Sequence, residues 1–183
     1  MKKLKGKILP IKLYGEEVLR KKSEPVKELT EEINQFITDL TVTMYEKDGV
    51  GLAAPQVGRS LRIFVIDPFW FKEGHKKDPF VLINPEFKEF EGETSMEEGC
   101  LSLPNIYAKV VRAEKVIIEG LNQNWEKVKI EADDLFARAL QHEYDHLEGI
   151  LFVDKVPKLK KIPFLKELKK LEQQVKNNNL TNS

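Results

Sequence analysis

The sequence predicts an α+β fold in which mostly antiparallel or mixed β-sheets pack around a central helix, with an N-terminal helix and a C-terminal surface helix. Two observations predict this class. Three segments carry apolar residues at helical spacing, and short runs rich in β-branched and aromatic residues lie between the first two. These runs follow one another too closely to be joined by crossover helices throughout, so an all-parallel sheet is excluded.

The N-terminal helix is predicted from residue 30 to about residue 47, with Thr30 and Glu32 near its start. Its apolar face consists of Ile33, Phe36, Ile37, Leu40 and Met44. An amphipathic pattern of this kind indicates a helix that packs on an apolar layer. The β-rich runs that follow are residues 62–66, 80–83, 109–111 and 116–118.

The central helix is predicted from about Asp133 to Leu147, opened by two acidic residues and closed by Gly149. The C-terminal surface helix is predicted from about residue 164 to residue 175. Its apolar face consists of Leu165, Leu168, Leu171 and Val175, with lysines elsewhere. Residues 176–183 are polar and are predicted to form a frayed tail.

Length and composition predict a single domain over residues 1–183, because a chain of this length holds one sizeable core. The 30 basic and 30 acidic residues balance, so no net field indicates a nucleic-acid site or an anionic membrane as partner. No stretch approaches the roughly 20 apolar residues of a membrane span, and the basic N-terminus lacks a signal-peptide core. With one cysteine, this composition suits a reducing cytoplasm, where we expect the protein.

Two histidines of the central helix, His142 and His146, are four residues apart and present their imidazoles to one point. Leu135 and Ala139 precede them at matching spacing, so the pair continues an inward face. Glu143 stands beside one histidine, as in the His-Glu-x-x-His pattern, where the glutamate takes a proton from a metal-bound water. The pattern predicts a metal-binding helix; the alternative is two core histidines beside an exposed glutamate.

A catalytic metal usually has three protein ligands and an open position. His75 lies in a charged stretch and is predicted to be in a solvated loop. Cys100 could supply a thiolate instead, although a lone cysteine is more often a small buried hydrophobe. In residues 49–58, glycines allow close backbone approach, and Gln56 could donate its amide to a developing oxyanion. The alternative for that segment is a glycine-rich turn.

Three segments, GVGLAAPQVG, EEGCLSLP and QHEYDHLEG in this order, resemble the signature motifs of the peptide deformylase family. The similarity extends through INPE and FARALQHEYDHLEGILFVDKV and covers most of residues 5–157. The resemblance implies metal-dependent hydrolysis of the N-formyl group from the N-terminal formylmethionine of newly synthesised proteins. A metal-bound water or hydroxide would be the nucleophile, and formate would be released.

The resemblance also implies a role for each matching residue. Cys100, His142 and His146 would bind one divalent metal ion per chain, ferrous iron in the cell, with zinc, nickel or cobalt able to substitute. Glu143 would act as general acid and base. Gln56 and the backbone N–H of Leu101 would polarise the formyl oxygen, and the Gly51 backbone would hold the substrate. The methionine side chain would lie near Val50, Met96, Leu135 and the aliphatic part of Arg138.

The resemblance names formylmethionyl nascent polypeptides as the substrate partner. It is closest to the bacterial branch with a C-terminal helix, and a basic helix there, with Lys166, Lys169 and Lys170, would allow ribosome docking. Such lysines ordinarily just solvate a helix. At Tyr107 the sequence departs from relatives that carry arginine, which puts a contact to the substrate backbone in doubt.

Three rival functions use the same residues. A metallopeptidase would share the helix motif but leaves the Gln56 and Cys100 motifs unexplained. A cysteine hydrolase would use Cys100 as nucleophile and His142 as base, without a metal. A non-catalytic binding module would keep the ion as a structural staple, yet closed structural sites have four protein ligands and the sequence offers three.

Overall fold

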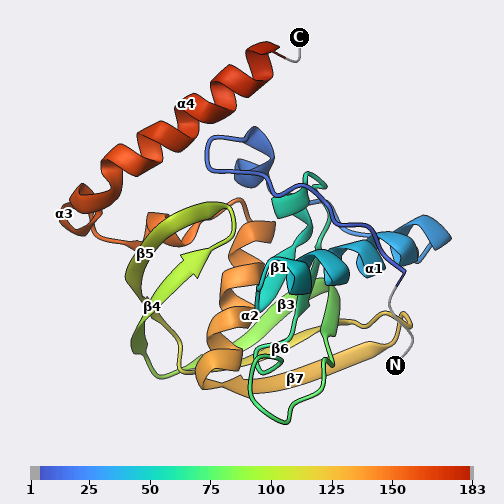
Figure 1. Cartoon of the computed structure of the whole chain (residues 1–183). Coiled ribbons are helices and arrows are strands. Elements are labelled where there is room, and N and C mark those ends of the chain that lie inside the picture. Colours follow the sequence, from blue (N-terminus) through green and yellow to red (C-terminus); the bar gives the residue numbers. More distant parts are fainter. Residues whose placement is uncertain (1–4, 182–183) are drawn as a thin grey trace.

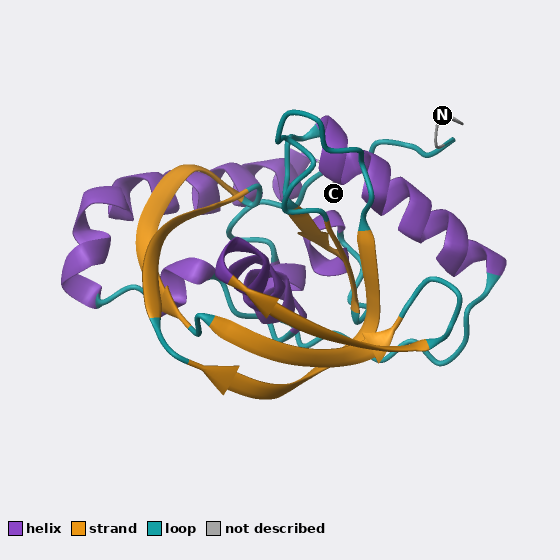
Figure 2. Ribbon diagram, turned by 90° about the horizontal axis from the view of Figure 1, so that it is seen from below, coloured by secondary structure: helices purple, strands orange, loops and turns teal. Residues whose placement is uncertain are grey.

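The computed structural model describes residues 5–181. Within this range, two β-sheets curve around helix α2 (Asp134–Leu147), which Figure 2 shows nearly end-on at the centre of the molecule. Helix α1 (Glu31–Glu46) lies beside the larger sheet, and helix α4 (Leu165–Thr181) extends along one side of the body (Figure 1). The predicted α+β class and the central helix are confirmed.

The larger sheet has five antiparallel strands in the order β1-β2-β3-β6-β7. The smaller sheet pairs β4 with β5, also antiparallel. Among the described residues, one isolated parallel bridge joins Glu24 to Leu61. The strands are β1 (Gly51–Ala53), β2 (Ile63–Ile66), β3 (Phe80–Glu91), β4 (Thr94–Cys100), β5 (Leu103–Arg112), β6 (Lys115–Leu121) and β7 (Lys127–Asp133).

The four predicted β-rich runs lie in β2, β3, β5 and β6. Strands β1, β4 and β7 were not predicted, because their sequences, GLA, TSMEEGC and KVKIEAD, are short, polar or glycine-containing. Leu52 of β1 and Ala132 of β7 are nevertheless buried in the core, and β4 pairs with β5 along its length. These strands matter for the candidate site, because β4 carries Cys100 and β1 carries Gly51, and both residues were predicted to act there.

Helix α1 begins as predicted: the Thr30 hydroxyl accepts a hydrogen bond from the Ile33 backbone N–H at 3.2 Å. The predicted apolar face is buried. The helix ends in a Schellman motif, in which Gly49 N donates to Met44 O at 2.9 Å and Asp48 N donates to Tyr45 O at 3.2 Å. Asp48 has a φ of 56°, a left-handed conformation that usually belongs to glycine at this position.

Helix α2 ends at the predicted glycine. Gly149 has a φ of 72°, and a Cβ atom there would lie 2.6 Å from the Arg20 carbonyl oxygen, so the turn requires glycine. The inner face of α2 is buried against β1, β2 and β7. This packing fixes the height and rotation of the two histidines that α2 carries.

The C-terminal region consists of α3 (Lys158–Lys161) and α4, and Leu168, Leu171 and Val175 of α4 are buried as predicted. Leu165, the first residue of the predicted apolar face, is 44% exposed. Helix α4 continues to Thr181 through most of the predicted tail, since extending a formed helix costs little. Residues 182–183 lie outside the described range.

The remaining elements are short 3₁₀ helices: η1 (Glu17–Arg20), η2 (Ala54–Val57), η3 (Phe152–Lys155) and η4 (Ile162–Phe164). Of these, η2 follows β1 directly and carries Gln56. Within residues 5–181, none of the helices is both apolar enough and long enough to cross a membrane.

Candidate active site

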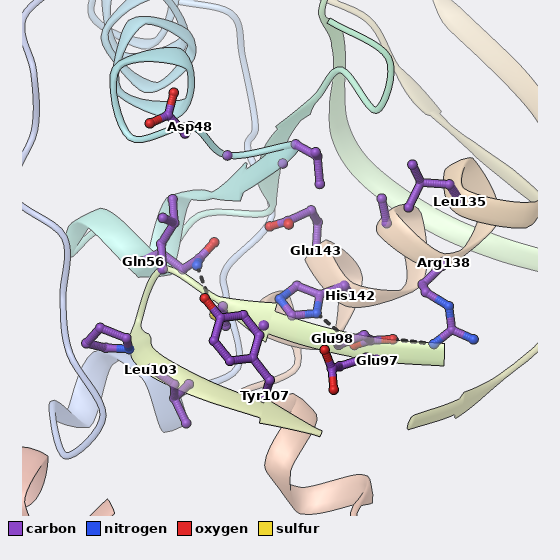
Figure 3. A pocket seen from close by; sticks show the side chains of 18 of the residues that line it. Asp48, Gln56, Glu97, Glu98, Leu103, Tyr107, Leu135, Arg138, His142 and Glu143 are labelled. Atoms are coloured by element: carbon purple, nitrogen blue, oxygen red, sulfur yellow. Dashed lines mark hydrogen bonds and ion pairs between the residues drawn. The ribbon is translucent and has the colours of Figure 1, made fainter. Parts of the chain in front are cut away.

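A pocket of about 470 Å³ opens between the β4–β5 hairpin, helix α2 and the segment from Asp48 to Gln56. Figure 3 shows Gln56 on one side of this pocket, His142 and Glu143 of α2 on the other, and Glu98 on β4. The pocket therefore gathers residues from all three sequence segments that drew attention.

Three candidate metal ligands converge beside the pocket. Cys100 is the last residue of β4, and His142 and His146 lie one turn apart on α2. The donor atoms of the three residues all lie within 4.8 Å of one another, and Cys100 Sγ is 3.3 Å from His146 Nε2. A tetrahedral ion with ligands at about 2.0–2.3 Å requires donor separations of roughly 3–4 Å, so these residues fit a divalent metal.

His142 is oriented by a residue that the sequence reasoning missed. Glu98, on β4, accepts a hydrogen bond from His142 Nδ1 at 3.0 Å, which turns the other ring nitrogen toward Cys100 and His146. Burial opposes the charged imidazolium of His142, but hydrogen bonds with Cys100 and Glu98 outweigh it and raise its pKa. Burial lowers the pKa of His146, which favours the neutral ring that binds metals.

Glu98 is itself held by two buried arginines. Arg112 Nε and Nη2 donate to the two Glu98 oxygens at 2.6 and 2.9 Å, and Arg138 Nη1 donates to Oε1 at 2.6 Å. Arg112 also reaches Asp145 on α2 at 2.7 Å. Burial opposes the Glu98 carboxylate, but the bonds from His142 and Arg112 hold its pKa well below the usual range. This network ties β4, β5 and α2 together.

A sequence signal for this network was weak. Glu98 stands in a run of polar residues that reads as exposed, and only the alternation of β4 turns its side chain inward, where it is 7% exposed. Arg112 ends an apolar strand and gives no separate pattern. Partners that lie 14 and 33 residues apart in sequence become visible only when the strands are paired.

Glu143 points into the pocket from α2 and is 3% exposed. Its Oε2 atom is buried and makes no hydrogen bond within residues 5–181, as suits a carboxylate that faces a substrate or water. Burial raises the pKa of Glu143 to about 7, so it can exchange a proton at neutral pH. A Cβ atom on Gly51 would lie 2.5 Å from Glu143 Oε1, so a side chain at this position of β1 would displace the carboxylate.

Gln56 is buried, and its two amide atoms have separate tasks. Oε1 accepts a hydrogen bond from Ala53 N at 2.8 Å, which turns Nε2 toward Cys100 Sγ and Ser102 Oγ, each 3.4 Å away. Leu101 lies in the tight turn between β4 and β5, directly after Cys100. Both predicted oxyanion donors therefore stand next to the candidate metal ligand.

Val50, Leu135 and Arg138, three of the four residues predicted near the methionine side chain, line the pocket described here. The guanidinium of Arg138 is committed to Glu98 and to the carbonyls of Val110 and Thr94. Met96 was predicted there as well, but it does not line the pocket and is 42% exposed. It lies two residues before Glu98, about 7 Å along β4, and the pocket ends before that point.

Tyr107 stands where some relatives carry arginine. It lines the pocket from β5 and is 63% exposed. A Cβ atom on Gly99 would lie 2.7 Å from Tyr107 Cε1, so the ring covers the backbone of β4 next to Cys100. His75 is exposed in the loop before β3, as predicted.

A buried glutamate beside a Cys–His–His ligand set, in an open pocket of an α+β fold, defines the class of metal-dependent hydrolases. Comparison with known proteins then narrows the class. The polypeptide deformylase family profile matches residues 8–162. The chain belongs to the polypeptide deformylase family.

Individual relatives agree. A peptide deformylase of Thermodesulfovibrio yellowstonii is 47% identical over 162 residues, covering 88% of this chain and 97% of the relative. One from Halothermothrix orenii is 49% identical over 152 residues, covering 83% and 96%. The crystal structure of a peptide deformylase from Legionella pneumophila, 43% identical, matches with a TM-score of 0.83 over 91% of this chain and 96% of that one.

Membership in this family makes the chain an enzyme that removes the N-formyl group from nascent peptides. The family is metal-dependent, and the Cys100, His142 and His146 cluster could bind the ion. The resemblance that the sequence motifs carried is thereby confirmed.

Proposed function

We propose that the deformylation reaction uses the residues that converge in this pocket. Cys100, His142 and His146 would hold the ion, Glu143 would move the proton, and Gln56 with the Leu101 N–H would bind the formyl oxygen. The observation that carries the proposal is the meeting of three ligand atoms within 4.8 Å beside a buried, unpartnered Glu143 oxygen.

A bound divalent ion supplies a Lewis acid and lowers the pKa of coordinated water toward about 7. We propose ferrous iron as the ion in the cell, with zinc, nickel or cobalt as substitutes. A thiolate and two imidazoles accept all of these ions, so the ligand types support a soft-to-borderline divalent metal and not magnesium or calcium.

Glu143 has the burial and the pKa that proton transfer requires. With a pKa of about 7, its carboxylate accepts the proton of the attacking water, and the resulting acid then protonates the amine nitrogen as the formyl C–N bond breaks. The products are formate and a peptide with a free N-terminal methionine. Because Glu143 lies against Gly51, the proton is handled at the point where the substrate backbone would pass.

Gln56 and Leu101 would stabilise the oxyanion of the tetrahedral intermediate. Since Ala53 N fixes Gln56 Oε1, the Nε2 donor is already aimed at the region of Cys100 before substrate arrives. A preorganised donor of this kind typically contributes about 10²–10³ in turnover. The Leu101 N–H in the hairpin turn would supply the second donor.

The Gly51 backbone would hold the formylmethionyl unit, with the methionine side chain near Val50, Leu135 and the aliphatic part of Arg138. Because the guanidinium of Arg138 is paired with Glu98, its aliphatic stem is the part that would contact the methionine side chain. Gly51 supports this placement because a side chain there would displace the Glu143 carboxylate.

The remaining proposals concern the cell. We propose cytoplasmic action on chains emerging from the ribosome, with docking through the lysines of α4. Lys166, Lys169 and Lys170 are exposed on that helix, which supports an electrostatic contact with an acidic partner.

The deciding experiment measures formate release from a formylmethionyl peptide by anaerobically purified protein, before and after chelation, with metal quantified in the same sample. We expect about one metal per chain and activity that chelation removes and ferrous iron restores. Chelator-resistant release would favour Cys100 as a nucleophile with His142 as its base, since the donor atoms of these residues lie within 4.8 Å of each other. Metal without formate release would refute the proposed roles.

A further inference from the structure

One wall of the pocket is formed by residues 48–51, which run from the end of α1 to the first residue of β1 and all line the pocket. The Schellman motif at the end of α1 holds the start of this wall through Gly49 N and Met44 O. Figure 3 shows Asp48 where the helical ribbon ends. Its left-handed φ of 56° is a conformation that persists only where the surroundings hold it in place.

The second support of the wall comes from the loop of residues 67–79 between β2 and β3. Asp67 N donates to Val50 O at 2.8 Å, and the indole Nε1 of Trp70 donates to Gly49 O at 2.9 Å. Two consecutive carbonyls of the wall are therefore fixed by one loop. The Trp70 bond is the only one of the two that a side-chain substitution can remove.

Trp70 is itself held in place on several sides. The Tyr45 ring meets it edge-on, with centroids 5.5 Å apart, and Lys77 Nζ lies 5.0 Å from the Trp70 centroid. Tyr45 OH donates to Asp67 Oδ2 at 2.6 Å, and Asp78 N donates to the same oxygen at 2.9 Å. These bonds join the two ends of the loop, so the indole has a defined position from which to hold the wall.

We propose that Trp70 is a positioning residue for substrate binding: its indole N–H fixes the Gly49 carbonyl, and thereby the wall against which the formylmethionyl unit lies. The inference rests on the proposed function, because it uses Gly51 as the substrate-binding strand. None of the contacts of Trp70 reaches Cys100, His142 or His146. Loss of the bond should therefore weaken binding and leave the chemical step unchanged.

The test compares Trp70→Phe with Trp125→Phe in metal-loaded, full-length enzyme, using formyl-Met-Ala-Ser as substrate. The chain has two tryptophans, and Trp125 lies in the turn between β6 and β7, so the second variant is a matched control. Removing one neutral hydrogen bond corresponds to roughly a 3- to 10-fold change, which we expect as a rise in KM with kcat within twofold. The control should match the wild type in both constants.

A second variant covers the case in which Trp70→Phe fails to fold. Tyr45→Phe keeps the ring but loses the bond to Asp67, and we expect a smaller KM rise in the same direction. In the double variant the two effects should be less than additive, since both act through the same loop.

An unchanged KM in folded Trp70→Phe overturns the inference. If Trp70→Phe does not fold, an unchanged KM in Tyr45→Phe overturns it instead. In both cases, a wild-type enzyme that is active leaves the proposed function unaffected. A fall in kcat alone also overturns it, because that result would place Trp70 in the chemistry. Wild-type protein that releases no formate refutes the proposed function, and the inference with it.

Discussion

The two sides of the pocket are built in opposite ways. On the side of β4 and α2, buried charges hold the candidate ligands through a network of Glu98, Arg112, Arg138 and Asp145. On the side of residues 48–51, the wall is backbone, and single hydrogen bonds to its carbonyls hold it. The difference indicates that buried ion pairs fix the positions of the candidate metal ligands. The proposed substrate-binding wall is fixed instead by hydrogen bonds of its backbone.

The largest expected effect lies where the two sides meet. Glu143→Ala should retain the metal but lose about 10²–10⁴ in kcat, since general acid–base catalysis typically contributes that much. Formate release and metal content measured on the same preparation check this. Near-normal turnover with full metal would refute Glu143 as the proton carrier. It would also mean that Glu143 does not link the charged side of the pocket to the backbone side.

The next effect tests the backbone side. Gly51→Ala places a Cβ atom 2.5 Å from Glu143 Oε1, so the carboxylate or the strand must shift. A displacement near 1 Å can cost about 10² in rate, and we expect a loss of that order in kcat/KM. Gly74→Ala is the control: a Cβ there meets nothing within 4 Å, and because Gly74 has a positive φ of 82°, the substitution should affect stability alone. Equal activity of the two variants would show that the approach at Gly51 is not limiting.

The charged side is tested by Glu98→Gln. The substitution leaves two buried arginines partly unpaired and removes the anionic partner of His142. We expect metal affinity to fall about 10- to 100-fold and stability to fall by about 3 kcal/mol or more. Metal titration and denaturant unfolding check these values. The neighbouring, exposed Glu97→Gln should change neither, and an equally mild result at Glu98 would contradict the electrostatic account.

The smallest effect concerns the strain in the wall. Asp48→Gly removes the cost of a left-handed aspartate at the end of α1, offset in part by the greater freedom of glycine in the unfolded chain. Thermal unfolding should show a gain of up to about 1 kcal/mol. A loss of stability would mean that the aspartate side chain holds the turn in a way that its backbone bonds do not reveal.

Helical spacing was sufficient to predict α1, α2 and the inward direction of His142 and His146, because these features repeat locally. Cys100 could be tied to them only by family resemblance, since a hairpin turn 42 residues earlier has no local reason to meet α2. The role of Glu98 could not be predicted, because the direction of its side chain depends on the pairing of β4 with β5. The lining of a pocket along a strand is likewise a tertiary property, which is why Met96 could be placed near one only by family resemblance.

Trp70 illustrates the same limit from the opposite side of the pocket. In sequence it is the middle one of three consecutive aromatic residues in a loop without periodicity, and its hydrogen-bond partner lies 21 residues earlier. No spacing rule connects an indole N–H to a particular backbone carbonyl. The role of a residue in such a loop can be recognised only when the fold has placed its side chain next to its partner.

The single thiol of the chain makes the candidate metal centre chemically addressable. A thiol-reactive dye has one target here, Cys100, which stands beside His146 and lines the pocket. A thiolate engaged by an ion reacts with such a dye more slowly than a free one. The labelling rate therefore reads out occupancy of the centre directly, without substrate and without background from any other position in the protein.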